Sequence, residues 1–242
     1  MKILSSNFGL SLAILLLSNS LIAQKDSSAT KSDSLKKATK ELPLEPEREI
    51  SLKNPKITWM SVDVNPSSSK IAFDAMGDIY IMPIAGGKAE AITQGMAYEV
   101  HPRFSPDGKS LVYISDKSGA QNVWVMDLET KKERQITKDK NQVYFSADWS
   151  PDGQYIVAAK GRRNIKLHLY HIESGSGVQL TKKPESLKAI DPFFSKDGEY
   201  IYFSSRKGAW NYNADLPQYS VQRYNMETGE IESVVSTYGS AF

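Results

Sequence analysis

The three histidines, His101, His168 and His171, are the first residues to consider for metal chemistry. A hydrolytic zinc centre needs several imidazoles, usually a His-x-His pair on one strand, together with further His and Asp ligands. His168 and His171 lie three apart in a predicted strand, so their side chains point to opposite faces. We therefore predict no metal ligands here; one histidine is expected at an edge and one packed against a neighbouring sheet.

Nucleophilic chemistry has no sequence support either. A serine peptidase of the α/β-hydrolase type places its nucleophile in a Gly-x-Ser-x-Gly elbow, and this pattern does not occur. The run Glu173-Ser174-Gly175-Ser176-Gly177 suits a hairpin turn, and no glycine-rich phosphate-binding loop is present. The basic run Lys160-Gly161-Arg162-Arg163 is expected to be a solvated tip between strands rather than an anion site. We assign no catalytic residue.

One segment, residues 206–219, carries side chains suited to binding. It is a longer connection than those at the same place in the other repeats. Loops on a rigid scaffold often carry function, and aromatic rings beside amides can hold a ligand or a partner. Direct ligand contact stays open, but packing of the two aromatic rings against another domain is the favoured role. The candidate docking residues are Trp210, Asn211, Tyr212, Asn213 and Asp215.

A recurring turn organises the rest of the chain. Phe104-Ser105-Pro106-Asp107-Gly108 returns at 149–153 and, with Lys in place of Pro, at 194–198. Pro presets φ, Asp bonds its own backbone and Gly accepts a positive φ, so each copy predicts a β-hairpin. A calcium loop would need further oxygen ligands at alternating positions, so the aspartates are interpreted as turn formers. The turn residues are Pro106, Asp107, Gly108, Pro151, Asp152, Gly153, Asp197 and Gly198.

A weaker copy of the turn occupies 65–73. It reads Asn-Pro-Ser-Ser-Ser and lacks Asp-Gly. We therefore expect Ser68 to tolerate a β-branched residue better than Gly153 does.

The spacing of the turns predicts the fold. Ser105, Ser150 and Ser195 are 45 residues apart, and the threonines that close the repeats are 44 apart. Four short strands in a period of roughly 40–45 residues are typical of a β-propeller blade, whereas a β-sandwich would not require such regular spacing. The predicted fold is all-β, a β-propeller of four-stranded blades with four blades present in an incomplete ring. The blades are expected at about 58–93, 101–137, 146–181 and 191–235.

The innermost strands are predicted at Trp59–Val64, Pro102–Ser105, Ala147–Ser150 and Pro192–Ser195. The loops between blades, at 94–100, 138–145 and 182–190, all follow a closing threonine. They should therefore emerge on one face of the propeller. The side chains expected around that face are Tyr98, Glu99, Tyr144 and Glu185.

The composition and the two ends of the chain limit the possible class of protein. The chain has 242 residues, no cysteine and a net charge of +2, which argues against nucleic acid binding driven by bulk charge. Residues 1–23 resemble a secretory signal, although an uncleaved anchor stays open; residues 24–47 suit a disordered linker, and 48–242 the propeller segment. The expected location is secreted or periplasmic. Residues 238–242 resemble the start of a fifth blade, which would leave an incomplete ring prone to self-association.

The repeats resemble those of the TolB and tricorn-type β-propellers, with their PD40 or WD40-like repeats. The resemblance rests on Phe104–Lys109, Asn122–Asp127 and Arg134–Thr137, and it extends over residues 58–235. It implies the propeller fold. It implies less about function, because such propellers serve both as binding scaffolds and as covers for enzymes.

A narrower resemblance rests on Thr58–Pro66, Gly77–Tyr80 and Ser204–Tyr212. These runs look like the N-terminal propeller of secreted proteins that carry an amidohydrolase domain downstream. In that family the hydrolase is a metal-dependent barrel enzyme acting on C–N bonds other than peptide bonds. The resemblance implies no cofactor in this segment; a divalent metal, zinc, would enter only with the downstream domain.

The expected function is therefore a non-catalytic docking or access surface for a downstream hydrolase. The expected partner is that domain or another envelope protein, with no nucleic acid and no membrane beyond the signal peptide. Two alternatives stay open: a stand-alone TolB-like scaffold, and the propeller cover of a prolyl-oligopeptidase-type serine peptidase. A downstream His-x-His run, a stop after blade closure and a downstream Gly-x-Ser-x-Gly elbow would distinguish the three.

Overall fold

The structure, a computed structural model, consists of strands and their connections and describes residues 56–58, 60–206 and 219–235. In these ranges all regular elements are β-strands, and no helix is long and apolar enough to cross a membrane. The predicted signal segment, the linker, the docking loop and the start of a fifth blade lie outside the described residues.

Sixteen strands form four sheets. The first sheet holds β1 (Val62–Val64), β2 (Lys70–Ala75), β3 (Asp78–Pro83) and β4 (Glu90–Ala91). The second holds β5 (Glu99–Phe104), β6 (Ser110–Ser115), β7 (Asn122–Asp127) and β8 (Glu133–Gln135). The third holds β9 (Tyr144–Trp149), β10 (Tyr155–Lys160), β11 (Lys166–His171) and β12 (Gly177–Gln179). The fourth holds β13 (Lys188–Phe194), β14 (Tyr200–Arg206), β15 (Ser220–Asn225) and β16 (Ile231–Val235).

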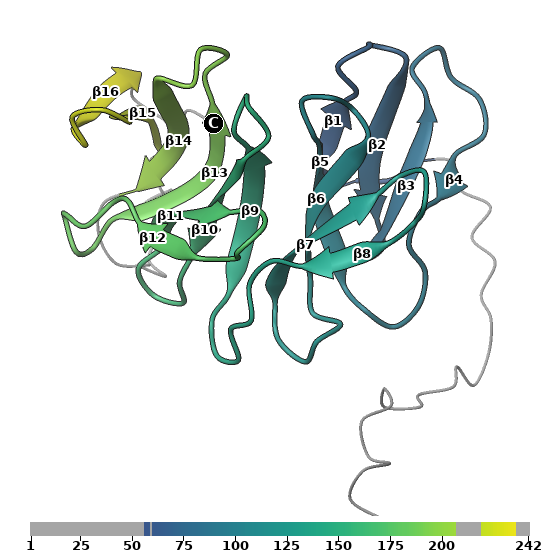
Figure 1. Cartoon of the computed structure of the whole chain (residues 1–242), viewed down its shortest axis with the longest axis horizontal. Helices are drawn as coiled ribbons and strands as arrows, with labels where there is room; N and C mark the ends of the chain where they lie inside the picture. Colours follow the sequence, from purple (N-terminus) through teal and green to yellow (C-terminus); the bar gives the residue numbers. More distant parts are fainter. Residues whose placement is uncertain (1–55, 59, 207–218, 236–242) are drawn as a thin grey trace, which may run out of the picture. The chain divides into compact units, whose positions relative to one another are not determined.

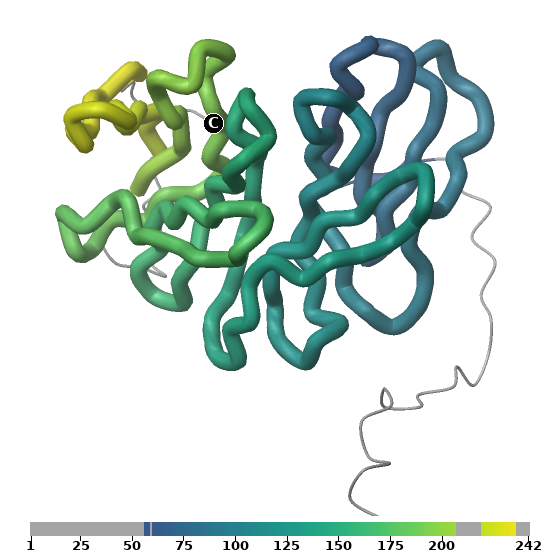
Figure 2. Tube along the Cα trace, in the orientation of Figure 1, coloured from purple at the N-terminus to yellow at the C-terminus, as the bar shows by residue number. Residues whose placement is uncertain are grey.

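Each sheet is an antiparallel meander whose strand order follows the sequence. Figure 1 shows the four sheets one after another along the chain, and Figure 2 follows the same order along the Cα trace. The hairpins predicted from the turn motif join β5 to β6, β9 to β10 and β13 to β14. The prediction of an all-β propeller of four-stranded blades is confirmed.

The first strands of the second, third and fourth sheets differ from the prediction. They begin three or four residues earlier, because the ladder continues through a register shift near the middle of the strand in β5 and β13. At these shifts His101 and Asp191 adopt positive φ angles of +57° and +49°. An extra residue in a β-bulge interrupts the alternation of side chains, so the sequence pattern stops at the bulge although pairing does not.

Apolar side chains pack between consecutive sheets. The first and second sheets enclose a core around Ala72, Phe104 and Leu111. The cores between the second and third sheets and between the third and fourth sheets are built in the same way. On β6 both Val112 and Tyr113, which point to opposite faces, are fully buried. Strands covered on both faces explain the nearly continuous apolar runs in the sequence.

The described strands do not close into a ring. Substantial packing connects each sheet to the next one, and the first sheet is not packed in this way against the fourth. Each terminal sheet consequently has one face that no other described sheet covers. Val62 on the first sheet is 55% exposed, and Phe193 on the fourth is 50% exposed. Figure 1 shows β1–β4 and β13–β16 as the two terminal sheets.

Candidate functional site

The Asp-Gly turns are closed by their own side chains. In the second sheet the Ser105 hydroxyl donates to Asp107 Oδ1 at 2.6 Å, and the Lys109 N–H donates to the same oxygen at 3.0 Å. The Gly108 N–H donates to the Ser105 carbonyl at 2.8 Å. The same set of bonds recurs around Asp152 and Asp197.

These bonds explain the charge state of the turn aspartates. The hydrogen bond from the neighbouring serine, followed by the backbone N–H bond, lowers the pKa of Asp107, Asp152 and Asp197 below the usual value. Each carboxylate is thus ionised at neutral pH, with one oxygen engaged inside its own turn. The geometry gives them a structural role and assembles no calcium loop.

The weaker first turn has the same backbone as the others. Ser68 adopts a φ of +54°, and its N–H donates to the Asn65 carbonyl at 2.7 Å. Asn65 Oδ1 accepts from the Ser67 N–H at 2.8 Å and so replaces the aspartate. The expectation that Ser68 tolerates a β-branched residue better than Gly153 does stays a prediction, and the structure supplies a reason: the serine already bears the strain of a positive φ. Residue 68 occupies the left-handed region that glycine fills in the other copies.

The closing threonines form a second repeated device. Thr93, Thr137 and Thr181 are buried, and each Oγ1 accepts the N–H of the second residue of the third strand. The three distances are 2.9, 2.9 and 3.0 Å. Thr137 also donates to Asn122 Oδ1 at 2.9 Å. The hydroxyl satisfies a buried backbone donor at the place where the short outer strand ends.

Side chains on the inner strands join the sheets in pairs. Asp63 accepts the Phe104 N–H at 2.7 Å, and Asp74 accepts the His101 N–H at 2.8 Å. These two hydrogen bonds connect the first sheet to the second. Two hydrogen bonds connect the third sheet to the fourth in the same manner. There Asp148 accepts the Phe194 N–H at 3.0 Å, and Ser146 accepts the Asp191 N–H at 3.0 Å.

Asp148 is the inner-strand carboxyl with the most perturbed acidity. Burial raises its pKa to about 6, and the negative charge of Asp63 adds to the rise. The backbone N–H donors of Phe194 and Trp149 and the charge of Arg103 oppose it. Asp63, Arg103 and Asp148 hold equivalent positions two residues before the turn anchor. Their charges therefore interact across neighbouring sheets.

The histidines do not form a metal site. His101 accepts from or donates to the Ser61 hydroxyl at 2.8 Å, and burial lowers its pKa. His168 stacks on Tyr170, and His171 contacts the ring of Tyr155 edge-on. Among the described residues, no group of three or more His, Asp or Glu side chains could hold a metal ion. The donor set of this segment does not fit the zinc centre of an amidohydrolase.

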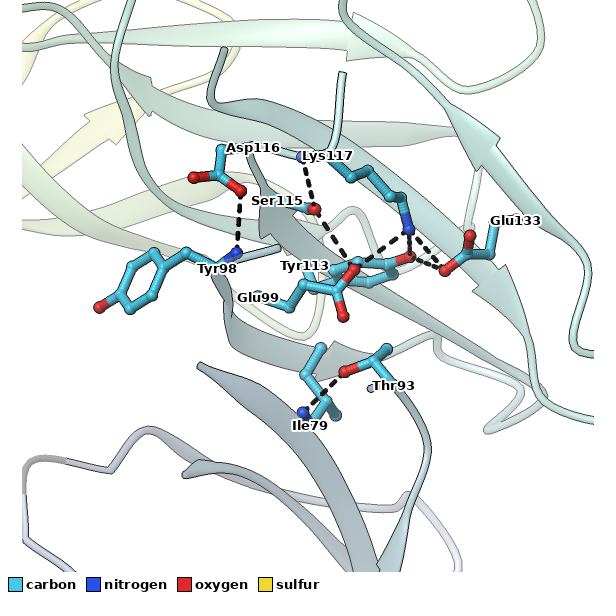
Figure 3. A network of polar contacts seen from close by, with 9 residues as sticks. All are labelled: Ile79, Thr93, Tyr98, Glu99, Tyr113, Ser115, Asp116, Lys117 and Glu133. Carbon is cyan, nitrogen blue, oxygen red and sulfur yellow. Dashed lines mark hydrogen bonds and ion pairs between the residues drawn. The ribbon is translucent and has the colours of Figure 1, made fainter. Parts of the chain in front are cut away.

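Lys117 is the centre of a polar network in the second sheet (Figure 3). Its Nζ lies 3.2 Å from Glu99 Oε1 and 2.5 Å from Glu133 Oε1, and it donates to the Tyr113 hydroxyl at 2.9 Å. It also lies 4.3 Å from the centre of the Trp124 ring. The Lys117 ammonium group is thus stabilised by two carboxylates and an aromatic ring. The network fixes the loop after β6 and leaves no reactive amine.

The prediction for the face that carries the loops between blades is correct for two of its four side chains and wrong for the other two. Tyr98 and Glu185 are exposed as expected. Glu99 and Tyr144 instead begin β5 and β9 and are buried. Tyr144 donates to Asp139 and hydrogen-bonds Tyr170 at 2.9 Å. The extended first strands draw both side chains into the interior.

A lateral groove of about 980 Å³ lies between the second and third sheets. Trp149 and Ile172 contribute to its lining, and an ion pair between Arg134 and Glu173 at 3.3 Å bridges the two sheets. Asp107 and Asp152 also line it, but each is engaged in its own turn. The groove assembles no nucleophile with a neighbouring base.

The fourth sheet has a face that no described sheet covers, as an incomplete ring of four blades predicts. Phe193 stacks on Tyr202 with ring centres 5.3 Å apart, and Arg223 lies 4.3 Å from the centre of the Tyr200 ring. The residues equivalent to Tyr202 are Ala72, Val112 and Val157, and each is fully buried under the next sheet. The predicted docking residues Trp210, Asn211, Tyr212, Asn213 and Asp215 lie outside the described residues.

Comparisons with known proteins agree with this architecture. Residues 60–174 match the family model described as the Tricorn protease N-terminal beta propeller domain. The chain is 35% identical over 170 residues to dipeptidyl-peptidase 5 of Porphyromonas gingivalis, covering 66% of this chain and 23% of the peptidase. The chain thus spans about a quarter of that relative.

Solved structures show the same arrangement of strands. TolB from Acinetobacter baumannii superposes with a TM-score of 0.61 at 25% identity, over 74% of this chain and 44% of TolB. The tricorn protease superposes with a TM-score of 0.53 at 15% identity, over 77% of this chain and 18% of the protease. The repeated turns, the closing threonines and these likenesses together show that the chain is a β-propeller similar to those of TolB and the tricorn protease.

Proposed function

We propose that this chain is the non-catalytic propeller segment of a larger secreted or periplasmic hydrolase, in which it docks on the hydrolase domain and shapes access to it. One observation carries the proposal: a scaffold that resembles part of longer hydrolases leaves an aromatic sheet face uncovered. The positions equivalent to Tyr202 are fully buried in the other three sheets. A face of this construction is suited to a covering element.

The proposed hydrolase is of the amidohydrolase type and cleaves C–N bonds other than peptide bonds. Support comes from the runs at 58–66 and 77–80, which look like the N-terminal propeller of such proteins. The runs contribute β1 and the start of β3, with Asp63 and Asp74 securing the next sheet. The described residues do not fit a zinc centre. A metal would accordingly belong to the hydrolase domain.

A second candidate is the propeller cover of a prolyl-oligopeptidase-type serine peptidase. The observation that favours it is the 35% identity with dipeptidyl-peptidase 5. A stand-alone TolB-like scaffold that binds envelope proteins is the third candidate, supported by the superposition on TolB. In all three, the propeller binds and the bond chemistry belongs elsewhere.

The docking surface proposed for the hydrolase includes two parts. The first is the face of the fourth sheet that carries the exposed Phe193 and the half-buried Tyr200 and Tyr202. The second is the predicted docking loop with Trp210 and Tyr212, which connects two strands of the same sheet. Large, flat aromatic side chains with polar neighbours are typical anchors of protein interfaces.

Isolation of the native protein would distinguish the three candidate functions. We would raise antibodies against residues 56–206, capture the protein from its source cells, and measure its mass and hydrolysis of N-acyl amides. We expect a polypeptide well above 27.0 kDa whose activity is lost on chelation and restored by zinc. Labelling by a fluorophosphonate, with no effect of chelation, would establish the peptidase alternative. A native product of 27.0 kDa without hydrolysis would overturn the hydrolase proposal.

A further inference from the structure

Cationic side chains gather at one end of the third and fourth sheets. In an antiparallel meander, the connection from the second to the third strand and the connection to the next sheet lie at the same end. The described loops at this end are residues 138–143, 161–165 and 182–187. Their exposed cations, here named the basic rim, are Lys138, Lys140, Arg162, Arg163, Lys182 and Lys183.

The three loops form one continuous surface. Lys160 Nζ contacts Asp139 Oδ2 at 2.9 Å, and the Gly161 N–H donates to the Val143 carbonyl, so the first loop adjoins the second. Lys166 Nζ donates to the Pro184 carbonyl at 2.6 Å, which joins the second loop to the third. The three loops that carry the six cations are therefore neighbours in space, although 45 residues separate Lys138 from Lys183.

Little negative charge offsets the rim. The acids within the three loops are Asp139, which is paired with Lys160, and Glu185. Behind the rim, the strand ends add three buried cations, Lys166, Lys188 and Arg206. Burial lowers the pKa of Lys166 and Lys188.

The opposite end of the same two sheets has the opposite charge. Its four hairpin turns, at 150–154, 172–176, 195–199 and 226–230, contain a single cation, Lys196. Their acids are Asp152, Glu173, Asp197, Glu199, Glu227 and Glu230. The chain's near-zero net charge thus conceals two separated fields, and the basic end can attract and orient an anionic partner.

We infer that the basic rim is a binding site for an acidic peptide segment, recognised through its carboxylates. The three loops have no exposed large hydrophobic side chain, so they lack the apolar anchors that a membrane-surface site uses. They also lack exposed aromatic rings on which single-stranded bases could stack. Carboxylates spaced along an extended peptide can pair with the lysines and arginines of the rim. The inference is independent of which hydrolase class the propeller serves.

Fluorescence anisotropy with a labelled decaglutamate peptide tests the site on the full chain. We expect saturable binding at low ionic strength that weakens as salt is added. Changing Arg162→Glu and Arg163→Glu together, or Lys182→Glu and Lys183→Glu together, should weaken binding by about tenfold or more. The matched control, Lys131→Glu with Lys132→Glu, makes the same charge change in the β7–β8 turn at the other end and should leave affinity within about twofold.

Urea unfolding of each variant shows whether that variant folds. If Arg162→Glu with Arg163→Glu does not fold, Arg162→Gln with Arg163→Gln is measured in its place. Equal losses in the rim and control variants would overturn the site, since net charge alone would then explain binding. Absence of decaglutamate binding would overturn it as well. Tighter binding of phosphatidylglycerol vesicles or of a dT decamer, lost in the same variants, would assign the rim to lipid or nucleic acid instead.

Discussion

The turn at Gly153 allows the sharpest test of how the repeat is stabilised. Gly153 has a φ of +69°, and its N–H donates to the Ser150 carbonyl at 2.9 Å. A Cβ placed on Gly153 would meet no other atom within 4 Å. Gly153→Val therefore introduces backbone strain without a steric clash. At Gly108, by contrast, an added Cβ would lie 2.8 Å from Asn65 Nδ2, so both effects would mix.

The expected loss follows from two opposing effects. The left-handed conformation costs an L-residue about 1–2 kcal/mol, and more for a β-branched one. Replacing glycine also restricts the unfolded chain, which returns about 0.4–1 kcal/mol. We expect Gly153→Val to lower the free energy of unfolding by about 1–3 kcal/mol. For a domain of this size each kcal/mol lowers Tm by about 2–4 °C.

Urea unfolding followed by tryptophan fluorescence measures the change, because Trp149 immediately precedes the turn. The m value should stay constant, so that the midpoint alone reports stability. Ser68 supplies the matched comparison at φ +54°. Since the wild-type serine already bears the strain, Ser68→Val should cost less than Gly153→Val, while Ser68→Gly should raise stability by about 0.5 kcal/mol.

Two results would refute this reasoning. If Gly153→Val leaves the midpoint unchanged, position 153 does not require a positive φ. If Ser68→Gly lowers stability beyond the entropy cost of a glycine, then residue 68 is not strained, and the first turn differs from the others.

Three further predictions concern acidity, the closing threonine and the docking loop. The folded pKa of Asp148, about 6, exceeds its unfolded value, so its contribution to stability is complete below about pH 4 and is lost as pH rises through 6. Asp148→Asn should thus stabilise the chain by about 1–2 kcal/mol at pH 7 and not at pH 4; an equal gain in urea melts at both values would exclude titration as the cause. Thr137→Val leaves the buried Val123 N–H without its acceptor and should lower the free energy of unfolding by about 1–3 kcal/mol. The control Thr228→Val, at an exposed position, should change stability little. Equal losses in the two variants would contradict a stabilising role for the closing threonine. Trp210→Ala should weaken association with the proposed hydrolase domain and leave unfolding unchanged; a large loss of stability in the chain alone would make Trp210 a core residue.

The hairpin turns and the order of the strands were predictable from the sequence because the interactions that form them are local. Ser105, Asp107 and Lys109 bond one another within five residues. The spacing of 45 residues between anchors then indicates identical units. Identical units of four short strands bury their faces only by stacking, so the propeller follows.

The starts of the inner strands required the tertiary structure. The bulges at His101 and Asp191 are held by acceptors on the preceding sheet, Asp74 and Ser146, which lie 27 and 45 residues earlier. A sequence window around either bulge contains neither acceptor. The predicted strands therefore began too late in the chain, and Glu99 was left in a loop.

Charge segregation was likewise decided by the fold. Along the chain, Lys138, Arg162 and Lys183 are scattered among acids of similar number, and the net charge is only +2. The antiparallel meander sends alternate connections to opposite ends of each sheet. Cations and acids that alternate in sequence are thereby sorted into two surfaces, because strand direction, rather than distance along the chain, determines which side chains become neighbours.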